Sequence, residues 1–296
     1  AWHPAVAAMK HASEISGTRV AMLGSLAEGL SESWAVSLID QGILPLCGFE
    51  HGLRAIELVA QPAPRVGWQP HRASALPGNR YLIDEAAAKA MLSDARVPVP
   101  RGATAATPSD LAEAASGLTA PLVLKGLGHA HKSEAGLVRL GLTHDALAEA
   151  AAAMEMAQGF LVVEEMAQTP VAELLVGLRR DPVYGVSLTV GIGGVAAELL
   201  CDVATLILPA DRDDIRAALN GLRLAPILNG YRGRAAADID AAVDAIALLC
   251  RMIETSPAID EIEVNPLMLV QAGSGVLALD AVIWKTAPIV QKEDAS

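Results

Sequence analysis

The segment 259–283 constrains the fold more than any other part of this chain. It places two runs of β-branched and aliphatic residues on either side of the glycine-containing break 271–275, which predicts a β-hairpin. Side chains alternate between the two faces of a strand, so Glu263 and Asn265 are expected to point to the same side. Pro266 has no backbone N–H to donate, and we therefore expect it at a sheet edge or a strand end.

Asp280 stands on the returning strand of this hairpin, where it can face Glu263 and Asn265. Two carboxylates and an amide carbonyl are hard oxygen ligands, which suit Mg²⁺ better than zinc. Magnesium commonly binds one or two carboxylates together with substrate phosphates, so the pattern indicates half of a nucleotide site. The spacing alone fits a solvated strand edge equally well.

Composition favours a layered α/β protein in a reducing compartment. Hydrophobic residues make up 52% of the 296 residues and aromatic residues only 3%, so the core must consist mainly of Ala, Leu, Val and Ile. No apolar run approaches the ~18 residues of a membrane span and the start shows no signal pattern, so we expect no membrane association and a cytoplasmic location. The cysteines Cys47, Cys201 and Cys250 lie far apart in apolar surroundings, which indicates small buried side chains.

The formal net charge of −12 argues against a nucleic acid as partner. It does not exclude a nucleotide. A local Lys/Arg cluster with Mg²⁺ can hold phosphates inside an acidic protein.

Residues 1–62 show a β-α-β-α pattern, with strands at 19–23 and 42–46 and helices at 31–38 and 51–60. This order implies parallel strands joined by a crossover. The run is too short to bury both faces of a sheet, so we expect the last part of a larger α/β domain. The alternative is an N-terminal extension packed on the rest. Residues 63–79 have the Pro- and Gly-rich composition of a linker.

Residues 80–163 and 164–288 are expected to form two subdomains, followed by a tail at 289–296. In the first we predict helices at 82–92, from Thr107, and at 143–156, an extended stretch at 97–100, and strands at 121–125, 136–142 and 160–165. In the second we predict an antiparallel sheet from strands at 172–178, 183–191, 195–200 and 203–208. Asp211 and Asp214 cap a helix that ends near residue 221, and an amphipathic helix spans 238–254.

Several short motifs each admit a functional and an ordinary interpretation. Residues 126–133 nearly match a P-loop, but His131 replaces the second glycine, which excludes that motif. Lys125 ends an apolar strand, where a lysine either reaches solvent or meets an anion such as a phosphate. The ammonium of Lys132 disfavours protonation of the neighbouring His131, which keeps that imidazole neutral and nucleophilic. A His-Lys pair is also common in surface loops.

Three further motifs could contact a nucleotide. Glu164 and Glu165 end a strand and could accept hydrogen bonds from an adenine amino group and ribose hydroxyls, or simply face solvent. The glycines of 191–194 permit close backbone approach to a ligand, or form a β-bulge. Arg179 and Arg180 could bind a phosphate, or belong to a charged turn.

The order of these motifs is more specific than any one of them. They run Val-Leu-Lys125, His131-Lys-Ser-Glu-Ala-Gly-Leu-Val138, Val-Glu-Glu-Met166, Gly177-Leu-Arg-Arg-Asp-Pro182, Gly191-Ile-Gly-Gly-Val-Ala-Ala-Glu198, Leu228-Asn-Gly-Tyr-Arg-Gly233 and Glu263-Val-Asn-Pro266 with Leu279-Asp280. Residues 80–288 thereby resemble the ATP-grasp half of the nucleoside-diphosphate-forming acyl-CoA synthetases. This family includes ADP-forming acetate–CoA ligases and is related to the succinyl-CoA synthetase β-subunit. Residues 1–62 resemble the end of the flavodoxin-like CoA-ligase domain that precedes it in fused enzymes.

The resemblance implies the reaction acyl-CoA + NDP + phosphate ⇌ acid + CoA + NTP, with the phosphoryl group carried by histidines. It implies His131 as phosphoryl acceptor beside Lys132, and Mg²⁺ on Asn265 and Asp280 with Glu263 nearby. The implied ATP- or ADP-binding residues are Lys125, Glu164, Glu165, Glu173, Arg179, Arg180, Gly193 and Gly194.

Two departures from the family's pattern stand in the His131 loop, where the family usually has Asp at position 134 and a glycine at 137; this chain has Glu134 and Leu137. The resemblance also implies CoA- and acyl-binding domains that these residues do not contain. We therefore expect them in a longer chain or a partner subunit, within an oligomer. Two alternatives stay open: a nucleotide-sensing module without turnover, and an ATP-grasp carboxylate–amine ligase that needs no phosphohistidine.

Overall fold

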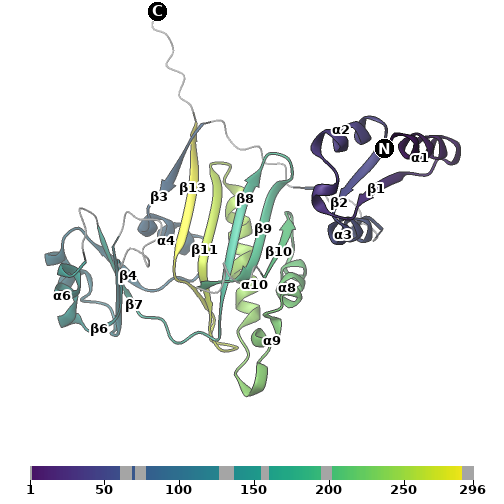
Figure 1. Ribbon diagram of the computed structural model, residues 1–296. Helices are drawn as coiled ribbons and strands as arrows, with labels where there is room; N and C mark the ends of the chain where they lie inside the picture. Colours follow the sequence, from purple (N-terminus) through teal and green to yellow (C-terminus); the bar gives the residue numbers. More distant parts are fainter. Residues whose placement is uncertain are drawn as a thin grey trace, which may run out of the picture. The chain divides into compact units, whose positions relative to one another are not determined.

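The computed structural model describes residues 2–60, 69–70, 78–126, 137–154, 160–194 and 202–288. The chain divides into two compact units, Ala1–Trp68 and Gln69–Ser296. Most of the predicted linker 63–79, the predicted strand 195–200 and the tail lie outside the described residues. Figure 1 labels the helices and strands of both units.

The first unit is a small parallel α/β layer. Strands β1 (Val20–Gly24) and β2 (Ile43–Cys47) pair in parallel, as the β-α-β-α pattern predicts. Helix α2 (Glu32–Asp40) connects them after a short 3-10 turn (Ala27–Gly29), and α3 (Phe49–Ala60) follows. Helix α1 (His3–Ser16) was not predicted. Its Val6 joins Leu38 of α2 and Ile43 of β2 in a small apolar core.

A seven-stranded antiparallel sheet dominates the second unit. Its order is β10-β9-β8-β11-β13-β3, with β12 paired to β11. The strands are β3 (Gly78–Ile83), β8 (Ala172–Asp181), β9 (Gly185–Ile192), β10 (Val203–Ile207), β11 (Ile259–Leu269), β12 (Val276–Ala278) and β13 (Ala281–Pro288). The strand pair β11–β12 and the return in β13 confirm the hairpin predicted for 259–283.

Helices cover one face of this sheet and bury its apolar side chains. Helix α10 (Ile239–Thr255) packs on β8 and β11, α8 (Arg212–Gly221) on β9 and β10, and α4 (Glu85–Asp94) on β13. The short helix α9 (Ala225–Leu228) and a 3-10 turn (Tyr231–Gly233) connect α8 to α10. Among the described residues, no helix has both the length and the apolarity that a membrane span requires.

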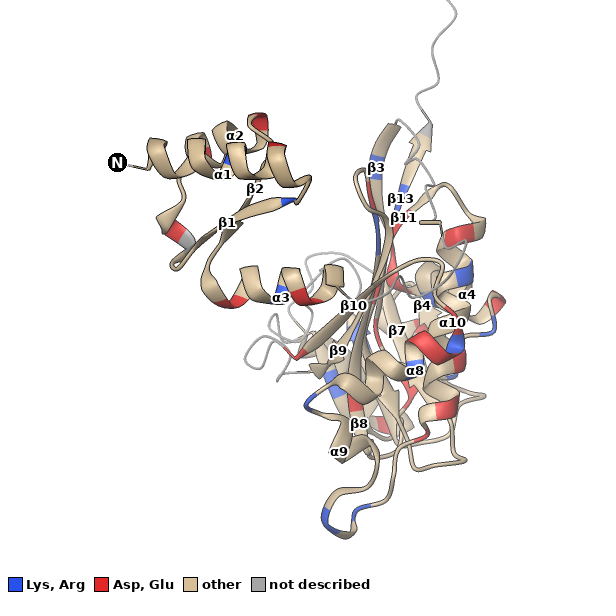
Figure 2. Ribbon diagram, turned by 90° about the vertical axis from the view of Figure 1, so that its right-hand side faces the viewer, with Lys and Arg blue, Asp and Glu red and all other residues tan. Residues whose placement is uncertain are grey.

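Local capping fixes where these helices begin, as the sequence indicated. Asp211 and Asp214 form a reciprocal capping box at the start of α8. Asp238 accepts the backbone N–H of Ala241 at the start of α10. The outer faces carry acidic residues, visible in red on α8 and α10 in Figure 2, and pairs such as Arg216–Asp240 partly balance them.

A second, four-stranded antiparallel sheet has the order β4-β7-β5-β6. It consists of β4 (Gly102–Ala105), β5 (Leu122–Gly126), β6 (Val138–Leu142) and β7 (Leu161–Glu165). One face packs on α5 (Leu111–Ala114) and α6 (Leu147–Ala152), which follow 3-10 turns at Pro108–Asp110 and His144–Ala146. A mixed α/β architecture, with one parallel and two antiparallel sheets, confirms the predicted fold class.

Several local predictions were wrong. The helix predicted from residue 82 begins only at Glu85, because the chain up to Ile83 pairs with β13 as an edge strand. Pro266 lies inside the central strand β11, where the register against β8 shifts between Val264 and Leu267 and no ladder N–H is required. Cys47 is exposed at the end of β2, whereas Cys250 is buried as expected.

Candidate active site

Lys125 lies near the end of β5, in the middle of the small sheet, and is only 8% exposed. Its Nζ lies 3.1 Å from Glu85 Oε1 and 3.1 Å from Glu164 Oε2, and donates to the carbonyl oxygen of Leu279 at 2.6 Å. Two hydrogen bonds and one further ion pair therefore hold this ammonium. Because Leu279 precedes the segment that enters β13, Lys125 ties the small sheet to the large one.

Two further residues of this cluster, Glu85 and Lys89, were not predicted. They stand one turn apart on α4, with Nζ of Lys89 3.1 Å from Glu85 Oε1, and Lys89 also pairs with Glu164 Oε1. An i,i+4 Glu-Lys pair was visible in the sequence, but such pairs usually stabilise an exposed helix face. Here both side chains are buried, because α4 packs on the large sheet while Glu85 and Lys89 form ion pairs with Lys125 and Glu164 of the small sheet.

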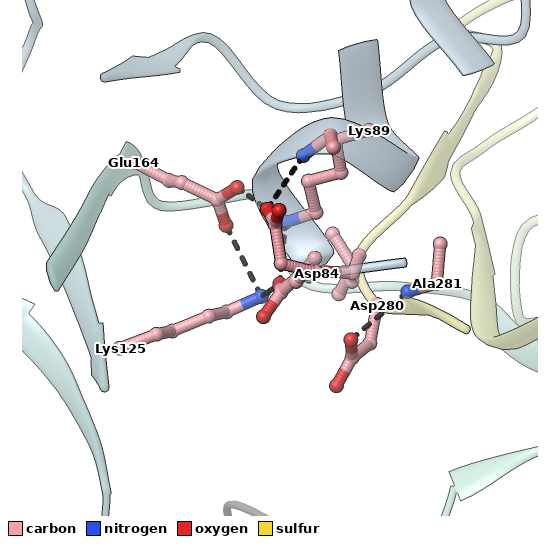
Figure 3. Close-up of polar contacts among 9 residues, drawn as sticks. Asp84, Lys89, Lys125, Glu164, Asp280 and Ala281 are labelled. Atoms are coloured by element: carbon pink, nitrogen blue, oxygen red, sulfur yellow. Dashed lines mark hydrogen bonds and ion pairs between the residues drawn. The ribbon is translucent and has the colours of Figure 1, made fainter. Parts of the chain in front are cut away.

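The cluster holds two acids and two bases, all less than 9% exposed. Burial alone would lower the pKa of Lys125, but the carboxylates of Glu164, Glu85 and Asp280 outweigh it and raise that pKa. Burial, reinforced by the charge of Lys125, lowers the pKa of Lys89. Lys125 is therefore held as a cation, and Lys89 forms ion pairs with the same two carboxylates. Figure 3 shows Lys125 and Glu164 reaching from the small sheet toward Lys89, with Asp280 on the other side.

Asn265 and Asp280 lie side by side in the large-sheet subdomain. The backbone N–H of Asn265 donates to the carbonyl oxygen of Asp280 at 3.3 Å, and Asp280 Oδ1 accepts the N–H of Ala281 at 2.9 Å. Asp280 was predicted on the returning strand, but it lies in the connection between β12 and β13, immediately before β13. The predicted neighbours are thus brought together, next to Lys125.

Gly193 and Gly194 bring the backbone close to the same place. The N–H of Gly194 donates to Asn265 Oδ1 at 3.1 Å. A side chain at Gly194, where φ is +65°, would begin 2.1 Å from Glu173 Oε2, and one at Gly193 would begin 2.5 Å from the backbone of Leu174. Glycine at both positions therefore allows the 193–194 backbone to lie against Glu173, Leu174 and Asn265.

Strand alternation decides which other predicted residues lie on this face. Along β11, Ile262 and Val264 are buried in the core while Glu263 and Asn265 are half-buried on the opposite face, as predicted. Arg179 of β8 is exposed on that same open face, aligned with Glu261.

Arg180 points the other way, as the alternation in β8 requires. Its guanidinium donates to the carbonyl oxygens of Ile259 at 2.7 Å and Ser256 at 3.0 Å, and to that of Ile253. These contacts hold the end of α10 against the start of β11. The structure therefore does not bring Arg180 to the cluster around Lys125.

Glu164 and Glu165 likewise diverge. Glu164 is engaged with both lysines, whereas Glu165 Oε1 accepts from Arg101 Nη1 and from the N–H of Thr119, each at 2.9 Å. Only Glu164 joins the cluster. His131 and Lys132 lie outside the described residues.

The polar groups near Lys125 include oxygen donors of the kind that Mg²⁺ prefers. Among the residues that the structure describes, no group of three or more His, Cys, Asp or Glu could by itself hold a metal. Asn265 and Asp280 offer an amide and a carboxylate oxygen, and an amide oxygen that accepts one N–H keeps a second lone pair. Such a set suits Mg²⁺ when phosphate oxygens complete the shell.

A cavity of about 470 Å³ adjoins this cluster on the side of α4, β4 and β7. It is lined by Lys89 and Glu164 but not by Lys125, Asn265 or Asp280.

A small and a large antiparallel sheet, joined by a buried lysine beside an Asn–Asp pair, define an ATP-grasp protein. The family model described as ATP-grasp domain matches residues 74–284, and the chain belongs to that family. Within it, the chain is β-subunit-like among the ADP-forming acyl-CoA ligases, as the following relatives show. The resemblance drawn from the ordered motifs is thereby confirmed.

Among curated relatives, the β subunits of ADP-forming acetate–CoA ligases II and I of Pyrococcus furiosus are 28% and 29% identical over 214 and 216 residues. These matches cover 68% and 69% of this chain and 91% of each subunit. A trans-feruloyl-CoA synthase from an unidentified prokaryote is 35% identical over 214 residues, which are 68% of this chain but only 30% of that protein.

Two solved structures show the same fold. A Pyrococcus horikoshii protein matches with a TM-score of 0.63 and 27% identity, over 70% of this chain and 92% of that one. The dinucleotide-forming acetyl-coenzyme A synthetase 1 of Ca. Korarchaeum cryptofilum, with coenzyme A and Mg-AMPPCP, matches with a TM-score of 0.58 and 26% identity, over 70% and 93%. In that structure the phosphohistidine segment points towards the nucleotide-binding site.

Proposed function

We propose that this chain binds Mg·ATP or Mg·ADP at Lys125 and transfers a phosphoryl group between the nucleotide and a histidine. It would thereby serve as the nucleotide half of an ADP-forming acyl-CoA synthetase. The observation that carries this proposal is the contact of Lys125 with Leu279. It places a buried cation from one sheet beside the Asn265–Asp280 pair of the other.

The residues around Lys125 and the Asn265–Asp280 pair have different roles in this proposal. Lys125 binds a nucleotide phosphate and spreads its negative charge. Asn265 and Asp280, with Glu263 on the same face, would hold the magnesium ion, which neutralises phosphate charge when bound. Arg179, exposed on the open face, contributes a further cation. The N–H of Gly194 orients the side chain of Asn265, and Glu173 lies beside Gly194 as a further nucleotide-binding residue.

The transfer step uses His131 as nucleophile. One imidazole nitrogen attacks the terminal phosphorus of ATP, the bond from that phosphorus to the bridging oxygen breaks, and ADP leaves. The reverse step returns the phosphoryl group from the histidine to ADP. Acyl-CoA chemistry, with acid and CoA as reactants, would take place on CoA- and acyl-binding domains of a longer chain or of a partner subunit.

The test is phosphorylation of the chain by Mg·ATP labelled at the terminal phosphate. We expect an acid-labile, base-stable label on the chain and none on His131→Ala, while ATP affinity changes little. His144→Ala, which alters a histidine that contacts backbone carbonyls away from the cluster, is the matched control. ATP binding without any label on the unaltered chain would instead support the nucleotide-sensing alternative.

A further inference from the structure

We infer that Lys89 is a positioning residue that allows Lys125 to leave its carboxylates and bind a nucleotide phosphate. This inference rests on the proposed function of Lys125. It concerns a residue that does not itself need to touch the nucleotide. The contacts of the buried cluster carry the argument.

Among the described residues, three oxygen acceptors surround the ammonium of Lys125. It donates to Glu85 and to the carbonyl oxygen of Leu279, and it forms an ion pair with Glu164. To contact a phosphate, its ammonium must give up at least one of these acceptors. Leaving a buried carboxylate without a partner is costly, because a buried charge needs an opposite charge or hydrogen-bond donors.

Lys89 contacts the same two carboxylates. It shares Oε1 of Glu85 with Lys125, each Nζ lying 3.1 Å away, and pairs with the second oxygen of Glu164. When Lys125 turns toward a phosphate, both acids therefore keep a cation. The incoming phosphate replaces only the acceptors that Lys125 has lost.

The positions of the two lysines fit two different roles, with Lys89 holding the carboxylates and Lys125 exchanging partners. Lys89 stands on α4, whose Ala88 and Leu92 are fixed in the core of the large sheet. Lys125 stands near the end of β5, next to the 127–136 segment that carries His131. The anchored lysine holds the acids, and the one beside the proposed phosphate site exchanges partners.

The experiment compares ATP with adenosine by calorimetric titration of the full chain in Mg²⁺. In Lys89→Met we expect ATP affinity to fall by about tenfold or more, because the carboxylates that Lys125 leaves then have no cation. Adenosine affinity should stay within about twofold. A general loosening of the fold would weaken both ligands alike. Lys10→Met, on an exposed position of α1, is the matched control.

Two further variants keep the inference testable if Lys89→Met folds poorly. Glu85→Gln with Lys89→Met restores charge balance, yet still leaves Glu164 dependent on Lys125, so the ATP-specific loss should persist. In a chain lacking both acids (Glu85→Gln with Glu164→Gln), adding Lys89→Met should no longer change the ATP-to-adenosine ratio.

The outcomes separate the inference from the proposed function. If the unaltered chain binds no ATP, or if Lys125→Met binds ATP as well as the unaltered chain, the proposed function fails. If Lys125→Met loses ATP affinity but Lys89→Met does not, only the inference fails. A loss on Lys89→Met that persists without the two acids would show direct contact of Lys89 with phosphate and would also overturn it.

Discussion

The ammonium of Lys125 donates a 2.6 Å hydrogen bond to the carbonyl oxygen of Leu279, 154 positions further along the chain. This contact joins the small sheet to the residue that precedes Asp280. A cation and a candidate metal ligand thereby lie next to each other although they belong to different subdomains. The predictions below address the residues around this junction.

Asp280→Ala should remove the magnesium-dependent part of nucleotide affinity. Losing one charged ligand is expected to cost about 1–3 kcal/mol. Titration of ATP with and without Mg²⁺ measures the difference, which should nearly vanish in the variant. Asp213→Ala, exposed in the first turn of α8, should leave it intact. If Mg²⁺ raised the ATP affinity of Asp280→Ala as much as that of the unaltered chain, Asp280 would not be a metal ligand.

Adjacent arginines on β8 should behave in opposite ways. Arg180→Ala leaves the carbonyl oxygens at the end of α10 without their buried donor, so we expect a loss of about 2–4 kcal/mol in the free energy of unfolding. Arg179→Ala, on the exposed face, should change stability by less than about 0.5 kcal/mol but weaken ATP binding. Urea denaturation and ATP titration of both variants distinguish them. Equal stability losses would show that strand alternation does not separate their roles.

Gly194→Ala should lower both the stability of the fold and the magnesium-dependent affinity for nucleotide. A Cβ there meets Glu173 Oε2, and φ of +65° disfavours any other residue, so a cost of about 1–3 kcal/mol in unfolding free energy is expected. Displacing the N–H that Asn265 accepts should also lower magnesium-dependent nucleotide affinity. Gly117→Ala, with no atom within 4 Å of the added carbon and no positive φ, serves as the control and should have little effect on either measurement.

Stability should fall in acid partly through Asp238. Burial alone would raise the pKa of this carboxyl, but the N–H groups of Gly275 and Ala241 outweigh it and lower that pKa. A lowered folded-state pKa contributes stability that is fully present above the ordinary value of about 3.9 and is lost as pH falls through the folded-state pKa.

Asp238→Asn keeps an oxygen to cap α10 but replaces one of the two acceptors that bind Ala241 and Gly275. We therefore expect a loss of about 1 kcal/mol in stability at neutral pH, the scale of one hydrogen bond, and a shallower decline below pH ~4. Denaturant titrations between neutral and acidic pH measure both. Asp240→Asn, which alters an exposed carboxylate in the same turn, should keep the acid dependence of the unaltered chain. An unchanged pH profile in Asp238→Asn would exclude this carboxyl as a source of acid sensitivity.

Local patterns in the sequence determined much of the fold. The capping box of Asp211 and Asp214, the hairpin at 259–283 and the common face of Glu263 and Asn265 all follow from turn chemistry and from the two-residue period of a strand. The family also followed from the sequence, because ordered motifs are a property of the chain itself. Edge strand β3 was missed because its residues carry no alternation, and only pairing with β13 makes them a strand.

Tertiary packing alone decided which charges meet. Glu85 and Lys89 have the spacing of an ordinary exposed helix pair, and only the tertiary arrangement of α4, β5 and β7 buries them with Lys125 and Glu164. In the same way, neither member of Glu164–Glu165 or Arg179–Arg180 is distinguished by sequence, since alternation says that neighbours diverge but not which one faces the core. Periodicity is a property of one element, whereas a buried cluster is a property of several elements brought together by the apolar surfaces they share.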